Sequence, residues 1–267
     1  LQMPNKYRSS SLIMIVDPSS NNVNSSILSR FGGLASVAGI SIPSSSGGKK
    51  SNLAEETIKS RDFFSQLIKD NDILHDLYAA KNYDKKSKKI IYDEKYNEEK
   101  STWNISNKNV SLKPSEQEAY IVYRSMLGIA VSDKSGYMTL SITHVSPEFA
   151  GTLIDLIVDK VNSITRQNDL IESDTALKYL KSMIGTVSNN ETKDSLTNLI
   201  EAQLETQMLV NIREDDYLLR YIDKPFSPEK KYSPRRSLYV ILSTLLGALF
   251  AILFVIYRDI NKTPYKL

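Results

Sequence analysis

One uncharged stretch near the end of the chain, residues 237–257 (SLYVILSTLLGALFAILFVIY), limits what this sequence can fold into more than any other feature. As an α-helix, these residues would extend about 30 Å, which is the thickness of the hydrocarbon core of a bilayer. Basic residues flank the stretch on both sides: Arg235, Arg236, Arg258 and Lys262. We therefore expect a transmembrane helix at 237–257, with almost the whole chain before it.

The composition excludes several classes of protein. The 267 residues carry a net charge of only +3, and lysines are mixed with carboxylates along the chain, so nucleic acid is not an expected partner. The chain has no cysteine, which excludes disulfide bonds, thiolate catalysis and cysteine-based metal sites. The lack of cysteine also fits an oxidising compartment such as a periplasm.

The first half of the chain predicts a mixture of strands, helices and loops. Residues 7–16 are rich in β-branched and apolar residues and end at a turn signal, which predicts a buried strand. Residues 27–42 are small and apolar with three glycines, and fit either a closely packed helix or a mobile loop. The low-complexity segment 43–52 (PSSSGGKKSN) indicates an exposed loop.

A helix is predicted to begin at Leu53, with Ser51 or Asn52 as its cap. Residues 81–102 form a charged, tyrosine-containing segment, an excursion from the helical pattern, in which apolar residues recur with only weak periodicity. A short helix is predicted after Pro114, because Ser115 and Glu118 have the spacing of a capping box.

The second half predicts a hairpin followed by long helices. Residues 129–131 and 137–145 fit two strands, and apolar and polar residues alternate in the second of them. Ser146-Pro147-Glu148 then has the order expected at a helix start. Apolar residues recur at helical spacing over 147–187, a helix of about 60 Å, which favours burial in an assembly.

Asn189-Asn190 interrupts this pattern, and residues 191–216 predict a second long helix. Residues 217–222 fit a returning strand, and the proline-rich segment that follows leads stiffly into the expected membrane helix. The expected fold class is α+β: a membrane-proximal α/β domain with a long projecting helical hairpin, then a C-terminal transmembrane helix. The expected units are an α/β region at 1–146, a long helical segment at 147–216, a return strand and linker at 217–236, the membrane helix at 237–257, and a cytoplasmic tail at 258–267.

Several motifs in this order resemble the bacterial polysaccharide co-polymerases, the chain-length determinant or Wzz family. They are KYRSSSLIMI, LASVAGI, SRDFF, YMTLSITHVSPEFAGTLIDLIVDKVN and YIDKPFSPEKKYSPRRSLYVILSTLLGALFAILFVIYR. The last carries most weight, because Ser-Pro-Arg-Arg leads directly into the hydrophobic segment. The resemblance covers nearly the whole chain.

The resemblance implies a protein of the bacterial inner membrane with most of its chain in the periplasm. Such proteins have two membrane helices around a periplasmic α/β domain, so a first membrane helix is expected before Leu1. Basic residues on both sides of 237–257 do not fix its orientation by themselves, and we follow the family. The implied partners are the lipid bilayer, further copies in a homo-oligomeric ring, a polysaccharide polymerase and a lipid-linked glycan.

The implied function is regulation of the chain length of a lipid-linked surface polysaccharide such as lipopolysaccharide O-antigen. The chain would act as an oligomeric scaffold on a membrane polymerase. The alternative is a polysaccharide export adaptor that docks an outer-membrane channel. A sensor ectodomain would lack a signalling output in the tail 258–267.

Enzymatic motifs are nearly absent. The segment GGKKS at 47–51 lacks the glycine and the Ser or Thr that a phosphate-binding loop requires. His75 and His144 are the only histidines and have no metal-ligand spacing, and we expect His144 to cap or pack the strand that it follows. We therefore predict a protein that is not an enzyme, with no catalytic residue, no cofactor and no metal.

The candidate functional residues lie around the expected membrane helix: Pro225, Pro228, Pro234, Arg235, Arg236 and Gly247. The prolines fit a stiff spacer that sets the height of the domain, and the resemblance adds contact with the polymerase or with neighbouring protomers. The two arginines fit anchors for lipid phosphates. Gly247 would allow close approach of another helix, although no full GxxxG pair is present.

Overall fold

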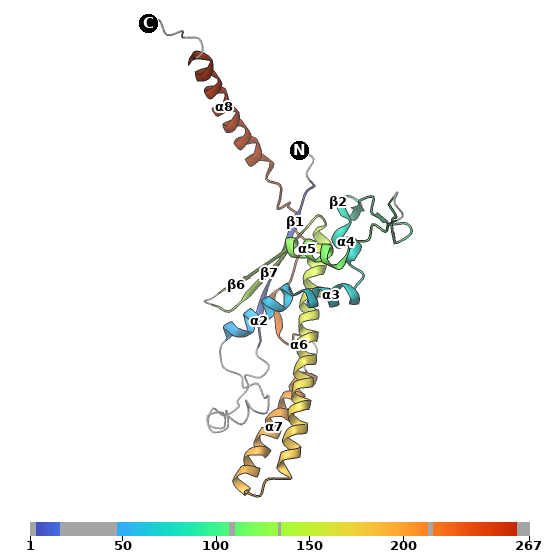
Figure 1. Cartoon of the computed structure of the whole chain (residues 1–267), viewed down its shortest axis with the longest axis vertical. Coiled ribbons are helices and arrows are strands. Elements are labelled where there is room, and N and C mark those ends of the chain that lie inside the picture. The colour runs from blue at the N-terminus through green and yellow to red at the C-terminus, as the bar shows by residue number, and fades with distance from the viewer. Residues whose placement is uncertain (1–3, 17–46, 107–109, 133–134, 213–215, 261–267) are drawn as a thin grey trace.

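The computed structural model describes residues 4–16, 47–106, 110–132, 135–212 and 216–260. It is a mixed structure of helices and strands, elongated along one axis (Figure 1). A body built around a four-stranded sheet lies in the middle, two long helices extend from one end, and a single helix projects from the other. The predicted segment 27–42 and the start of the predicted loop, residues 43–46, lie outside the described residues.

The central sheet has the strand order β6-β7-β1-β8, and all neighbouring strands are antiparallel. Its strands are β1 (Tyr7–Ile15), β6 (Leu127–Val131), β7 (Met138–His144) and β8 (Leu219–Asp223). The register of β1 and β7 places Tyr7 opposite His144 and Ile13 opposite Met138. The predicted N-terminal strand, hairpin and returning strand are all confirmed.

One face of the sheet is covered by α6 (Pro147–Ile184), a helix of 38 residues. Its cap is Ser146, whose hydroxyl accepts a 3.2 Å hydrogen bond from the Phe149 N–H, as the sequence predicts. The N-terminal half of α6 buries Leu153, Ile154 and Ile157 completely. Its C-terminal half packs instead against α7 (Asn190–Ile212), so the two helices form an antiparallel pair beyond the sheet (Figure 1). The predicted break between the two helices is confirmed, although α6 ends at Ile184, three residues before the predicted end, and α7 begins at Asn190, one residue before its predicted start.

The first described helix begins earlier than the sequence indicates. Helix α2 (Gly47–Lys59) includes the second half of the predicted loop, and Ser51 is 1% exposed within it rather than capping it. Ser51, Ala54 and Ile58 lie on one helical face, and all three are buried. Burial of this face favours an additional helical turn despite the low helix propensity of Gly47 and Gly48.

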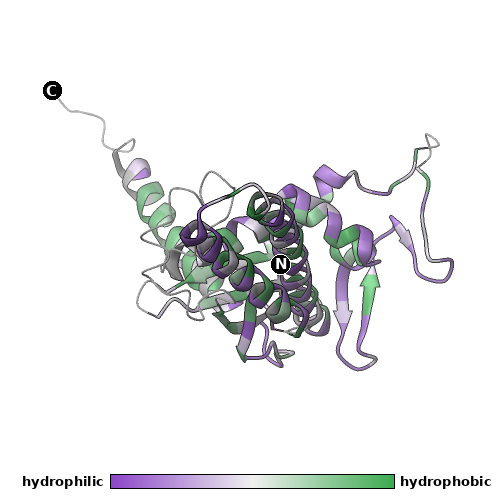
Figure 2. Ribbon diagram, turned by 90° about the horizontal axis from the view of Figure 1, so that it is seen from below, coloured by the Kyte–Doolittle hydropathy of each residue, from purple (hydrophilic) through white to green (hydrophobic). Residues whose placement is uncertain are grey.

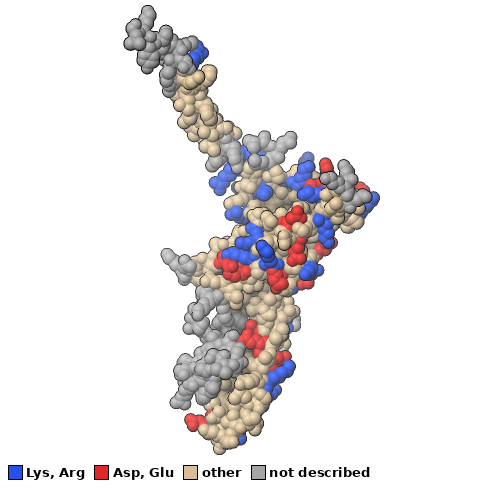
Figure 3. Space-filling view, viewed as in Figure 1, with Lys and Arg blue, Asp and Glu red and all other residues tan. Residues whose placement is uncertain are grey.

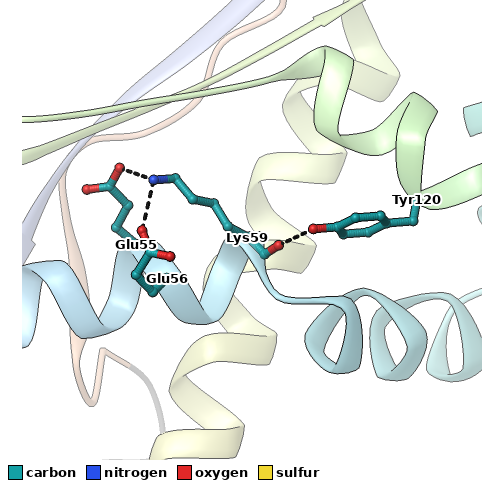
Figure 4. Close-up of polar contacts among 4 residues, drawn as sticks. All are labelled: Glu55, Glu56, Lys59 and Tyr120. Atoms are coloured by element: carbon teal, nitrogen blue, oxygen red, sulfur yellow. Dashed lines mark hydrogen bonds and ion pairs between the residues drawn. The ribbon is translucent and has the colours of Figure 1, made fainter. Parts of the chain in front are cut away.

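Two further helices follow, α3 (Arg61–Asp70), capped by Ser60, and α4 (Leu74–Tyr78). Helix α5 (Glu116–Met126) begins with the predicted capping box of Ser115 and Glu118. Two tyrosines of α5 donate hydrogen bonds to backbone carbonyls at the C-terminus of α2. Tyr120 donates a 2.6 Å bond to the Lys59 carbonyl, and Tyr123 donates a 2.9 Å bond to the Ile58 carbonyl. The Lys59 ammonium meanwhile contacts two glutamates of its own helix (Figure 4).

The charged excursion forms two small hairpins. One consists of β2 (Ala80–Asp84) and β3 (Lys89–Tyr92), and the other of β4 (Tyr96–Asn97) and β5 (Thr102–Trp103). Aromatic rings hold them on α4: the Tyr96 ring lies 4.9 Å from His75 and 5.4 Å from Trp103. Strands this short carry too few residues for a readable alternation.

Helix α8 (Arg236–Ile260) projects from the body and is mostly hydrophobic (Figure 2). Its large apolar side chains are exposed, from 49% at Leu246 to 66% at Phe250. None of the helices in the part of the chain that the structure describes is both long and apolar enough to cross a membrane, so the transmembrane helix expected at 237–257 is not found there.

Candidate interface at the base of helix α8

The segment between β8 and α8, residues 224–235, runs beside the beginning of β1. The Lys6 N–H donates a 2.9 Å hydrogen bond to the Ser233 carbonyl, and the Tyr232 N–H donates a 2.8 Å bond to the Lys6 carbonyl. The described chain therefore enters the body beside the point where α8 leaves it (Figure 1).

Two serines of β1 bind the end of β8 and the start of this linker. Ser9 donates a 2.7 Å hydrogen bond to the Phe226 carbonyl, and Ser11 donates a 2.6 Å bond to that of Asp223. Both serines are almost fully buried, at 0% and 1% exposure. The register of β1 and β8 shifts next to Leu12. Because regular pairing ends there, the serine hydroxyls supply hydrogen-bond donors to these two backbone carbonyls.

Arg8 fixes the linker from the outside. Its guanidinium carbon lies 3.7 Å from the centre of the Tyr232 ring, within the range of a cation–π interaction. Its Nε also donates a 3.1 Å hydrogen bond to the Thr143 hydroxyl on β7. Arg8 thus connects the linker to the neighbouring strand.

The turn between β2 and β3 reaches the same place. The Lys85 ammonium donates a 3.0 Å hydrogen bond to the Glu229 carbonyl. It also lies 5.2 Å from the centre of the Tyr7 ring. These contacts place a lysine-rich turn against the linker, although the two segments are far apart in the sequence.

Four of the six predicted site residues lie in this linker, and a fifth, Arg236, is the first residue of α8. Pro225 and Pro228 are half-buried, Ser233–Pro234 is a cis peptide, and Arg235 and Arg236 are exposed. Pro234 and both arginines line an open hollow with Lys231, Tyr232, Ser237 and Ile241.

Gly247 is not part of this cluster. It lies eleven residues beyond Arg236 on α8, about 16 Å along the helix axis. A Cβ at this position would meet no described atom within 4 Å. Its predicted contact with another helix remains a prediction.

The sequence interpretation missed Ser9, Ser11, Arg8 and Lys85. Ser9, Ser10 and Ser11 are consecutive, so composition does not single out two of them, and only the period of the strand places Ser9 and Ser11 on one face. No local signal could have placed Lys85 beside Glu229, which follows it by 144 residues.

His144 has the packing role that the sequence predicts. It is 2% exposed, its ring centre lies 4.6 Å from that of Phe149, and its Nδ1 accepts a 3.1 Å hydrogen bond from the Ser146 N–H. Burial lowers the pKa of His144 to about 4, so the imidazole is neutral near pH 7. Among the described residues, no group of three or more His, Asp or Glu side chains could hold a metal ion.

Comparison with solved structures finds polysaccharide co-polymerases, the class that the sequence motifs resemble. A full-length bacterial polysaccharide co-polymerase matches with 16% identity and a TM-score of 0.41, covering 100% of this chain and 90% of its own. A fragment of WzzB, a polysaccharide co-polymerase from Salmonella Typhimurium, matches with 14% identity and a TM-score of 0.29, covering 86% of this chain and 100% of its own. Protein-family models and curated protein sequences give no match. At these TM-scores and identities, the functional proposal depends on the motifs and on the geometry described above.

Proposed function

We propose that this chain regulates the length of a lipid-linked surface polysaccharide, such as O-antigen, as a non-enzymatic scaffold on an inner-membrane polymerase. The observation that carries the proposal is the placement of α8 and of the α6–α7 pair at opposite ends of the body (Figure 1). A chain anchored through α8 would extend the α6–α7 pair away from the bilayer, where it could set a height or bind neighbouring copies.

The sequence supports α8 as the anchor. Residues 237–257 contain no charged residue, and arginines lie immediately before and after them. In a single chain in water, the exposed apolar side chains of α8 would contact only solvent. A lipid bilayer would supply the apolar environment that they lack. We place the body and the α6–α7 pair in the periplasm, as the motif resemblance implies.

An exposed apolar stripe on α7 supports assembly into an oligomer. Leu204, Met208 and Ile212 recur every four residues and are 41%, 62% and 73% exposed. A contiguous apolar stripe on a helix surface is typical of a contact with another chain. We propose that a neighbouring copy covers it in a ring.

Deletion of the gene, followed by electrophoresis of the surface glycan, tests the function. We expect the preferred chain length to be lost, and an intact copy of the gene to restore it. An unchanged length distribution would contradict the proposal. Normal-length glycan trapped inside the cell would instead favour the export adaptor, for which the same α7 stripe would contact an outer-membrane channel.

A further inference from the structure

Basic side chains from three separate segments lie on or beside the linker that leads into α8. They form what we call the basic collar: Lys6, Arg8, Lys85, Lys86, Lys88, Lys89, Lys224, Lys230, Lys231, Arg235 and Arg236. Every one of these side chains is exposed. Figure 3 shows Lys and Arg at the end of the body from which the largely uncharged α8 emerges; further along the body, Lys and Arg are mixed with Asp and Glu.

Specific contacts join the three segments of the collar. Lys6 pairs with Ser233 through the backbone, and Lys85 binds the Glu229 carbonyl. The β1 start and the β2–β3 turn are therefore both fixed against the linker. The turn carries the sequence Lys-Lys-Ser-Lys-Lys, so four basic residues are brought to the linker that leads into α8.

The collar concentrates positive charge that the rest of the chain lacks. Segments 6–8, 84–89 and 223–236 contain eleven basic residues and three carboxylates, whereas the whole chain has a net charge of only +3. The remainder of the chain is therefore net negative. This asymmetry gives the chain a positive end beside α8.

Exposed aromatic residues accompany these charges. Phe226 is 55% and Tyr232 is 42% exposed, and both belong to the linker. Basic and aromatic side chains together are typical of proteins that lie at the polar surface of a bilayer.

The geometry points to a lipid surface rather than to one phosphate. A discrete phosphate site needs donors that converge, but the collar spreads over three segments, and the open hollow at the base of α8 gathers only Lys231, Arg235 and Arg236 from it. We propose that the basic collar binds anionic phospholipid headgroups, so that the β2–β3 turn rests on the bilayer and the body keeps one orientation. This inference rests on the proposed membrane span of α8.

The chain has no cysteine, so single labels can be introduced cleanly. Ser87→Cys places a fluorophore in the β2–β3 turn, and Ser188→Cys places one between α6 and α7 as a matched control. The full chain is reconstituted in nanodiscs of phosphatidylcholine, with or without phosphatidylglycerol. Lipids with spin-labelled headgroups then quench fluorophores that lie at the surface.

We expect stronger quenching at position 87 when anionic lipid is present, and a loss of that difference at high salt. The Ser188→Cys label should show neither effect. Lys86→Gln/Lys89→Gln removes two collar charges but keeps the Lys85 contact, and should weaken association of the turn with the anionic surface about 25-fold at low salt. The control Lys178→Gln/Lys181→Gln changes two exposed lysines of α6 and should leave the signal unchanged.

Three outcomes would overturn the inference. Equal quenching at position 87 in both lipid compositions would show that the collar does not recognise anionic headgroups. A saturable response to inorganic phosphate in zwitterionic nanodiscs, at constant ionic strength, would assign a discrete phosphate site instead. Failure of the chain to enter nanodiscs would contradict the membrane span itself, and with it the proposed function, so the two failures are distinguishable.

Discussion

The side-chain amide of Asn162 forms two hydrogen bonds with the backbone of Leu219. Its Nδ2 donates to the Leu219 carbonyl at 2.9 Å, and its Oδ1 accepts from the Leu219 N–H at 2.7 Å. The same oxygen accepts a third bond, at 3.0 Å, from the Leu218 N–H. Asn162 is 6% exposed, so α6 uses one buried polar side chain to fix the start of β8.

Replacing Asn162 should therefore destabilise the whole fold. Asn162→Ala leaves three backbone groups without this partner, and we expect the free energy of unfolding to fall by about 2–4 kcal/mol. Urea titration of the full chain in detergent measures the loss. Asn168→Ala changes an exposed asparagine of the same helix and should cost much less; equal losses would contradict the role of Asn162.

The buried serines of β1 predict a local effect on the linker. Ser9→Ala removes one hydroxyl bond to a linker carbonyl and Ser11→Ala removes one to the last carbonyl of β8, each worth about 1 kcal/mol. In the double variant we expect faster amide hydrogen exchange over residues 224–233. Ser10→Ala, on the opposite face of the strand, is the matched control, and exchange as fast as in the double variant would argue against the clamp.

His144 predicts a dependence of stability on pH. Its pKa is about 4 in the folded chain, below the usual histidine value of 6.5, so the unfolded chain binds a proton between these values that the folded chain does not. Stability should consequently fall as pH decreases from about 6.5 to 4, by about 3 kcal/mol from this group.

His144→Asn keeps an acceptor for the Ser146 N–H but cannot be protonated in this range. Between pH 7 and pH 4, its free energy of unfolding should therefore fall by about 3 kcal/mol less than that of the unchanged chain. Urea titrations at the two pH values test this, and identical falls would show that His144 does not contribute.

The apolar stripe of α7 predicts the result of introducing a charge. Met208→Glu places a carboxylate on the proposed contact between copies, and we expect a smaller assembly by light scattering of the full chain in detergent. Glu205→Gln alters an exposed neighbour on the same helix and should leave the mass unchanged. An unchanged mass for Met208→Glu would remove this stripe from the interface.

Gly247 predicts an effect that is separate from folding. No described atom lies within 4 Å of a Cβ placed there, so Gly247→Leu should leave the unfolding of the body unchanged. If another helix approaches this face of α8, the variant should alter the glycan length distribution. Ala248→Leu points about 100° away around the helix and serves as the control; equal effects would mean that Gly247 has no special role.

Much of the secondary structure could be predicted because its signals are local. Alternation in β7 and the cap at Ser146 each depend on residues within a few positions of one another. The error at α2 shows the limit of this approach. The segment 47–52 has the composition of a loop, but Ser51 is buried on the same helical face as Ala54 and Ile58, and this tertiary burial is invisible in local propensity.

The sequence by itself determined the long elements, their order, and the apolar character of residues 237–257, but not the small hairpins of β2 to β5, because periodicity needs several consecutive residues. It also singled out the prolines and arginines of the linker. Only the tertiary structure decided that β1 lies between β7 and β8, that Asn162 holds Leu219, and that Lys85 lies beside Glu229. These contacts join residues 57 to 211 positions apart, and their energies depend on the packing of the whole chain.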